Sequence, residues 1–60
     1  MSAFVALEAM GITVREMARL GDDALFYPMR RKLLVDAELS QAERERVACR
    51  TLGILATPAR

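Results

Sequence analysis

The sequence predicts an all-α protein, a small bundle of two to three main helices. Alanine, leucine, arginine, glutamate and methionine dominate the 60 residues, and all of these favour helices. β-Branched residues are few and do not alternate cleanly with polar ones, so the signals for strands are weak. Apolar residues instead recur every three or four positions, which is the spacing of one helix face. We therefore expect helices over about 3–20, 28–38 and 41–52.

The first expected helix, over 3–20, has two possible forms. Its apolar residues follow a 4-3-4-3 spacing that would align them on one stripe of a continuous helix. Gly11 argues for a break, and Thr13 with Glu16 has the form of a capping box that would start a new helix. Both forms remain open, and the break at 11–12 is slightly favoured. The stripe consists of Ala3, Leu7, Met10, Val14 and Met17.

The later helix boundaries follow from glycine, proline and serine. Gly21 is a helix stop, and Pro28 fits a first helical turn better than a helix interior, so the second helix should begin at Pro28. Ser40 and Glu43 form the strongest capping box in the chain, and the third helix should stop near Gly53. We expect residues 56–60 to be a flexible tail of a single small domain, 1–60.

The apolar content is high for so short a chain, because 53% of the residues are hydrophobic. One core at this length supplies only about 3–5 kcal/mol, so small proteins usually add a disulfide, a metal or a partner. Cys49 is the only cysteine and there is no histidine, which leaves self-association or partner binding. We expect a homodimer whose contact lies in the first segment, through Phe4, Leu7, Met10, Val14 and Met17.

The side chains of the chain argue against catalysis. Without histidine no Ser/His/Asp or Cys/His arrangement is possible, the neighbouring carboxylates do not converge on a helix, and no glycine-rich phosphate loop is present. We expect no enzymatic activity, no cofactor and no metal. The net charge is only +1, no secretory signal is visible, and no apolar run approaches the ~20 residues that cross a bilayer. A cytoplasmic protein without a membrane contact is expected.

One stretch has a partial resemblance to a DNA-binding family. Over Ile12–Gly21, Thr13, Glu16, Ala18 and Gly21 stand where a cap, a glutamate, a packing alanine and a turn glycine are usual. The stretch resembles the first helix and turn of excisionase and MerR-type helix-turn-helix proteins. The resemblance implies a DNA-binding regulator. The continuation departs from that family, because Asp22, Asp23 and Pro28 occupy the place of the recognition helix.

The segment after Gly21 is the predicted partner contact. Aromatic residues and arginine are enriched at binding hot spots, and here they gather beside a turn. We expect a small protein-binding module that docks on a larger intracellular protein and modulates it, as an inhibitor in the manner of phage or plasmid accessory proteins. A helix-turn-helix regulator and a structural assembly subunit are the alternatives. The predicted contacts are Leu25, Phe26, Tyr27, Met29, Arg30 and Arg31.

Overall fold

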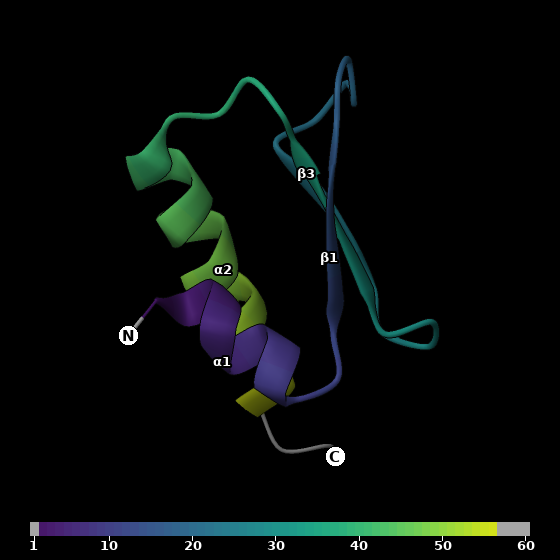
Figure 1. The fold of residues 1–60 in the computed structure, drawn as a ribbon. Helices are drawn as coiled ribbons and strands as arrows, with labels where there is room; N and C mark the ends of the chain where they lie inside the picture. The colour runs from purple at the N-terminus through teal and green to yellow at the C-terminus, as the bar shows by residue number, and fades with distance from the viewer. Residues whose placement is uncertain (1, 57–60) are drawn as a thin grey trace.

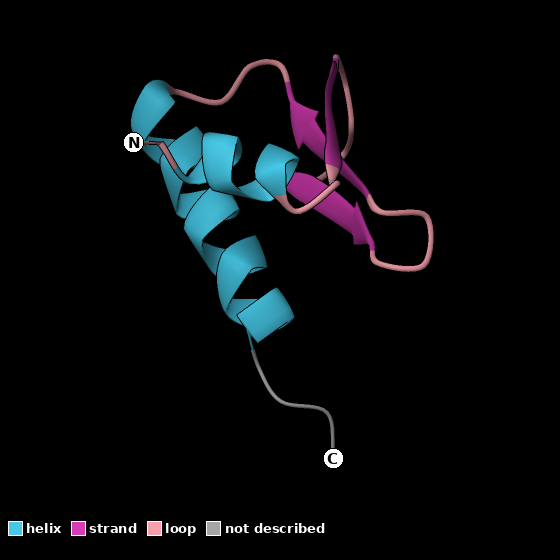
Figure 2. Ribbon diagram, turned by 60° about the horizontal axis from the view of Figure 1, so that its bottom comes forward, coloured by secondary structure: helices cyan, strands magenta, loops and turns pink. Residues whose placement is uncertain are grey.

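The computed structural model shows an α+β fold, so the all-α prediction is wrong. Residues 2–56 are described. Along the chain, one helix precedes the three strands and one helix follows them. Both ribbon views show the two helices together on one side of the sheet (Figures 1 and 2). The elements are α1 (Ala3–Ala9), β1 (Thr13–Met17), β2 (Ala24–Tyr27), β3 (Lys32–Asp36) and α2 (Gln41–Ala56).

The sheet is mixed, with the strand order β1-β3-β2. β3 is therefore the central strand, parallel to β1 and antiparallel to β2. Leu33 of β3 stands opposite Val14 of β1 on one side and Phe26 of β2 on the other. β2 and β3 form a hairpin, whereas residues 18–23 lead from β1 across to β2 at the opposite edge of the sheet.

The core lies between the sheet and the helices. It combines one residue of α1, one residue that follows α1, two residues of β3 and two of α2, all at most 3% exposed. The partly buried Val14, Ala24 and Phe26 pack against it from the two edge strands. Both helices thus cover a single face of the sheet. The core residues are Leu7, Ile12, Leu33, Val35, Val47 and Ala48.

The expected helix over 3–20 is in fact a short helix followed by a strand. α1 ends after Ala9, and Gly11 takes a φ of +84°, a left-handed conformation that suits glycine and turns the chain out of the helix. The β-branched run Ile12-Thr13-Val14 then extends into β1. The predicted capping box at Thr13 is wrong, because Thr13 starts a strand and Glu16 pairs with Arg44 of α2.

The expected helix over 28–38 is also wrong. Pro28 begins the turn between β2 and β3, whose closing bond runs from the Arg31 N–H to the Pro28 carbonyl at 3.2 Å. Leu33 and Val35 are buried while Leu34 between them is only half-buried, which is the period-two pattern of a strand with one covered face. The apolar run Leu33-Leu34-Val35 is so short that its spacing fits a helix as well as a strand.

The capping box at the start of α2 is confirmed. The Ser40 N–H donates to the Glu43 carboxylate at 3.0 Å, and the Glu43 N–H donates to the Ser40 hydroxyl at 3.2 Å. The Ser40 N–H, followed by the Ser40 hydroxyl, hydrogen-bonds the Glu43 carboxylate and lowers its pKa. The expected stop near Leu52 is wrong, because α2 continues through Gly53 to Ala56. The predicted tail began at residue 56, but Ala56 is the last residue of α2, and residues 57–60 lie outside the described residues.

Candidate protein-binding surface

The two faces of the sheet have different surroundings. Successive side chains of a strand point to opposite faces, so the register assigns each residue to one face or the other. Val14, Leu33, Val35 and Phe26 face the helices and pack in or against the core. The other set forms what we call the open face, since no helix among residues 2–56 lies on it (Figures 1 and 2). The open face consists of Thr13, Arg15, Met17, Leu25, Tyr27, Lys32, Leu34 and Asp36.

The open face has an apolar centre. Leu25 of β2 stands directly opposite Leu34 of β3, and both are half-buried. Tyr27 is 41% exposed and Met17 is 46% exposed, which is high for large apolar side chains. Arg15 stands opposite Leu34 from β1, and Lys32 stands opposite Tyr27. The result is an uncovered apolar surface bordered by the cationic Arg15 and Lys32 and, opposite Met17, by the carboxylate of Asp36.

The β2–β3 turn projects from the end of the sheet, and both ribbon views show it away from the helices (Figures 1 and 2). Met29 lies in this turn and is 95% exposed. Arg30 beside it is exposed, and no carboxylate of residues 2–56 forms an ion pair with it. The turn therefore presents one large apolar and one cationic side chain to solvent.

Arg31 has a different role from Arg30. Its guanidinium donates from Nη2 to the Met10 carbonyl at 3.0 Å, and its own carbonyl accepts the Thr13 N–H at 2.8 Å. Arg31 also adopts a φ of 51°, a conformation that closes the hairpin turn. A cation at the end of α1 complements the partial negative charge of helix carbonyls. Arg31 thus anchors the turn to α1, and this intramolecular contact occupies the side chain that the sequence placed in the partner contact.

The remaining predicted contacts are divided among different surfaces. Leu25 and Tyr27 lie on the open face, Met29 and Arg30 lie in the turn, and Phe26 faces the helices. The structure therefore brings two of the six together on the open face and places two more in the adjacent turn. Leu34, Arg15 and Lys32 also lie on the open face and were not among the predicted contacts. The alternation of buried Leu33 and Val35 around Leu34 was the available signal.

The predicted self-association residues do not form one stripe. That stripe required a helix through residue 17, but its members lie on α1, in the following turn and on β1. Leu7 is 0% exposed within the core, and Phe4 and Val14 pack against the core from α1 and β1. Met10 and Met17 are exposed but belong to separate elements. Three of the five side chains are therefore used inside the molecule.

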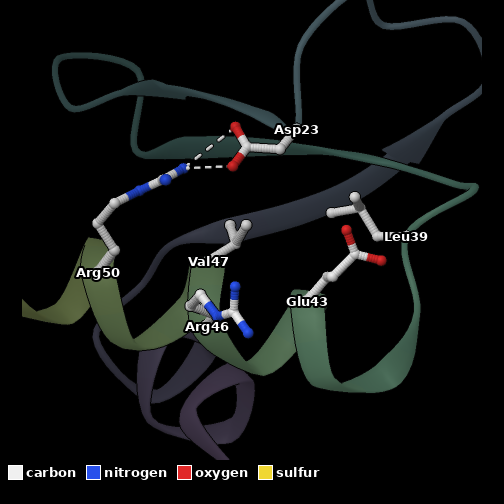
Figure 3. A pocket seen from close by; sticks show the side chains of 6 residues that line it. All are labelled: Asp23, Leu39, Glu43, Arg46, Val47 and Arg50. Atoms are coloured by element: carbon white, nitrogen blue, oxygen red, sulfur yellow. Dashed lines mark hydrogen bonds and ion pairs between the residues drawn. The ribbon is translucent and has the colours of Figure 1, made fainter.

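A small cleft lies between α2 and the start of β2 (Figure 3). Its volume of about 60 Å³ is far below the roughly 300–1,000 Å³ of pockets for organic ligands. Arg50 spans one side and holds Asp23 through both carboxylate oxygens, each at 3.2 Å. The Asp23–Arg50 pair therefore links α2 to the residue before β2, and the cleft beside it leaves little room for a ligand. Its lining residues are Asp23, Leu39, Glu43, Arg46, Val47 and Arg50.

The Asp23–Arg50 pair predicts a pH dependence of stability. The hydrogen bond from Arg50 holds the pKa of Asp23 below its usual value of 3.8. A carboxyl with a lowered pKa in the folded state stabilises the fold above its unfolded pKa, and this contribution is lost as the pH falls through the folded value. We expect thermal unfolding measured from pH 5 downward to show a smaller acid-induced loss in Asp23→Asn than in wild type. About 1 M salt should reduce the difference, because the pair is exposed. Identical pH profiles would contradict this role.

Three further expectations from the sequence concern a DNA-binding helix, a metal site and a membrane contact. Residues 13–17 form β1 in place of the helix that the resemblance to helix-turn-helix proteins implies. Within residues 2–56, no group of three or more histidine, cysteine, aspartate or glutamate side chains is placed to hold a metal ion. No helix of this described part has both the length and the apolar character to span a bilayer. Comparisons with protein-family models, with curated proteins and with solved structures find no match to the chain.

Proposed function

We propose that the protein is a non-catalytic binding module that docks through its open face on a larger protein and modulates it, in the first instance by inhibition. The observation that carries this proposal is the uncovered Leu25–Leu34 pair, bordered by the exposed side chains of Tyr27 and Met17. A sheet with one covered face usually has polar side chains on the other. An apolar centre on the solvent side is typical of an interaction surface.

The energetics favour a contact centred on this pair. Complete burial of a leucine or methionine side chain contributes about 1.5–3 kcal/mol. Tyrosine is enriched at binding hot spots because it offers a large rigid surface and a hydroxyl group. Tyr27, Leu25 and Leu34 are adjacent on two paired strands, so one partner surface can cover all three. The partner therefore needs a matching apolar patch.

The border charges indicate what should surround that patch. Arg15 and Lys32 lie at the border of the apolar centre, and Arg30 lies in the adjacent turn. Border charges increase the rate of association and select partners of opposite charge more than they add affinity. A partner with carboxylates around an apolar patch fits this arrangement. The bound module would inhibit the partner by covering a surface that the partner needs for its own contacts.

The test is recovery of a partner by affinity purification from the cells that express the protein, with mass spectrometry as the readout. Wild type should recover one protein in stoichiometric amount, and Leu34→Lys and Tyr27→Ala should lose it. Ile54→Lys is the matched control, because Ile54 is an exposed apolar residue on α2 and receives the same charge. The control should recover the partner as wild type does.

Two results would overturn the proposal. The first is recovery of the same protein by Leu34→Lys and Tyr27→Ala at the wild-type level, since the open face would then not be the contact. The second is binding of duplex DNA that weakens steeply with salt, without any protein partner. That result would favour the DNA-binding alternative.

A further inference from the structure

The outer edge of β2 is an unpaired strand edge within the described residues. β3 lies between β1 and β2, so each outer strand has one edge without a partner strand. β1 carries Arg15 and Glu16 within its length, and charged residues are a usual protection of edge strands. β2 has the sequence Ala-Leu-Phe-Tyr and carries no charge. The edge of β2 is thus the unprotected one.

The backbone groups at this edge can be assigned from one hydrogen bond. The Asp23 carbonyl accepts the Asp36 N–H at 3.0 Å, so Asp23 turns its backbone groups toward β3. Hydrogen-bonded and non-hydrogen-bonded positions alternate along an antiparallel pair. Leu25 and Tyr27 therefore also face β3 with their backbone groups. Ala24 and Phe26 turn their N–H and C=O groups outward.

The charges at the two ends of β2 are opposite. Asp22 precedes the strand and Arg30 follows it, and neither forms an ion pair with another side chain of residues 2–56. The neighbouring Asp23 and Arg31 are already engaged, with Arg50 and with the Met10 carbonyl. An antiparallel copy of the same strand would place the Asp22 end of each chain beside the Arg30 turn of the other. The edge is therefore complementary in charge to itself.

We propose that two copies of the chain pair along β2, antiparallel about a two-fold axis at Leu25, and join their sheets into one. In this register Ala24 lies opposite the second copy's Phe26, and these residues exchange both of their outward hydrogen bonds. Leu25 meets its counterpart on the open face, and Pro28, which has no N–H to donate, stays outside the new ladder. The same surface on both copies makes the contact, as a closed dimer requires.

This interface goes beyond the proposed function, because it uses the edge of β2 and leaves the open face uncovered. It makes the open faces of the two copies continuous, with their Leu25 side chains adjacent at the two-fold axis. It also provides the additional stabilisation that a domain of this size commonly takes from association. It replaces the segment that the sequence assigned to self-association, three of whose five side chains are packed inside the molecule.

Charge reversal at the two ends of β2 tests the interface by sedimentation equilibrium from about 1 µM to about 1 mM. Wild type should be a dimer, whereas Asp22→Arg and Arg30→Asp should each raise the dimer dissociation constant by about tenfold or more, because two attractive pairs become repulsive. An equimolar mixture of the two variants should dimerise again, since each then faces the opposite charge. Glu38→Arg, an exposed charge outside β2, should remain a dimer like wild type.

A second variant addresses the backbone hydrogen bonds. Ala24→Pro removes an N–H that points away from β3, so the fold should persist by circular dichroism while the dimer is lost. A wild-type monomer throughout the concentration range would overturn the proposal, as would variants that stay dimeric or a mixture that fails to reassociate. Leu34→Lys leaves the edge of β2 intact and should remain a dimer even when it loses its partner. Failure of the proposed function is therefore distinguishable from failure of the dimer.

Discussion

Leu33→Ala should leave the protein largely unfolded at room temperature. Leu33 is 1% exposed on β3, the central strand, and stands opposite Val14 of β1 and Phe26 of β2. Replacement of a buried leucine by alanine costs about 2–5 kcal/mol. That cost is comparable to the roughly 3–5 kcal/mol that a core of this size supplies. Urea unfolding followed by circular dichroism should show a midpoint near or below zero denaturant for this variant.

The adjacent residue provides the control. Leu34→Ala removes the same atoms from the same strand, but its side chain is only half-buried and lies on the open face. We expect it to lose less than half of the stability that Leu33→Ala loses. Equal losses at the two positions would contradict the one-sided sheet. This pair of variants therefore tests the fold directly.

Leu7→Ala should be the second most damaging substitution. Leu7 is 0% exposed and is the residue of α1 that belongs to the core. α1 has seven residues, and an isolated helix of this length is not stable in water, so its structure depends on this packing. We expect a loss of about 2–5 kcal/mol. Thermal unfolding measured by circular dichroism will show this loss as a lowered Tm.

Val5→Ala is the matched control on the same helix. Val5 is an exposed apolar residue of α1, so its truncation removes little buried surface. A small change in Tm is expected, and alanine even favours the helix slightly. If Val5→Ala destabilised the protein as much as Leu7→Ala, the assigned orientation of α1 against α2 and the sheet would be wrong. The exposed face of α1 would then have to be the packed one.

The start of α2 could be predicted from the sequence because its determinants are local. Ser40 and Glu43 lie one helical turn apart and satisfy each other's backbone N–H groups. The strand residues have no such local signal. Val14 finds its partner Leu33 far along the chain, and its strand conformation depends on that pairing. A helical 4-3-4-3 spacing over 3–17 therefore matched the sequence and was still wrong.

The sequence and the structure agree only in part on the residues of the proposed binding surface. Four residues of that proposed surface, Leu25, Tyr27, Met29 and Arg30, were already among the contacts predicted from the sequence, because aromatic and cationic residues gather near a turn in the sequence itself. Leu34 and Arg15 were not among the predicted contacts, because only the pairing of the strands places Leu34 beside Leu25 and Arg15 beside Leu34. Arg31 was also predicted as a partner contact, and in the fold its guanidinium donates to the Met10 carbonyl. Spatial neighbours of this kind are set by the sheet register.

By itself the sequence determined the residue types available for contact and chemistry, and the capped start of α2. The tertiary structure decided which apolar residues are used inside and which remain on the surface. The physical reason is the period of two in a strand, which separates Leu33 from Leu34 only once a helix layer covers one side of the sheet. Until that layer is placed, both leucines are equally suited to a core and to an interface.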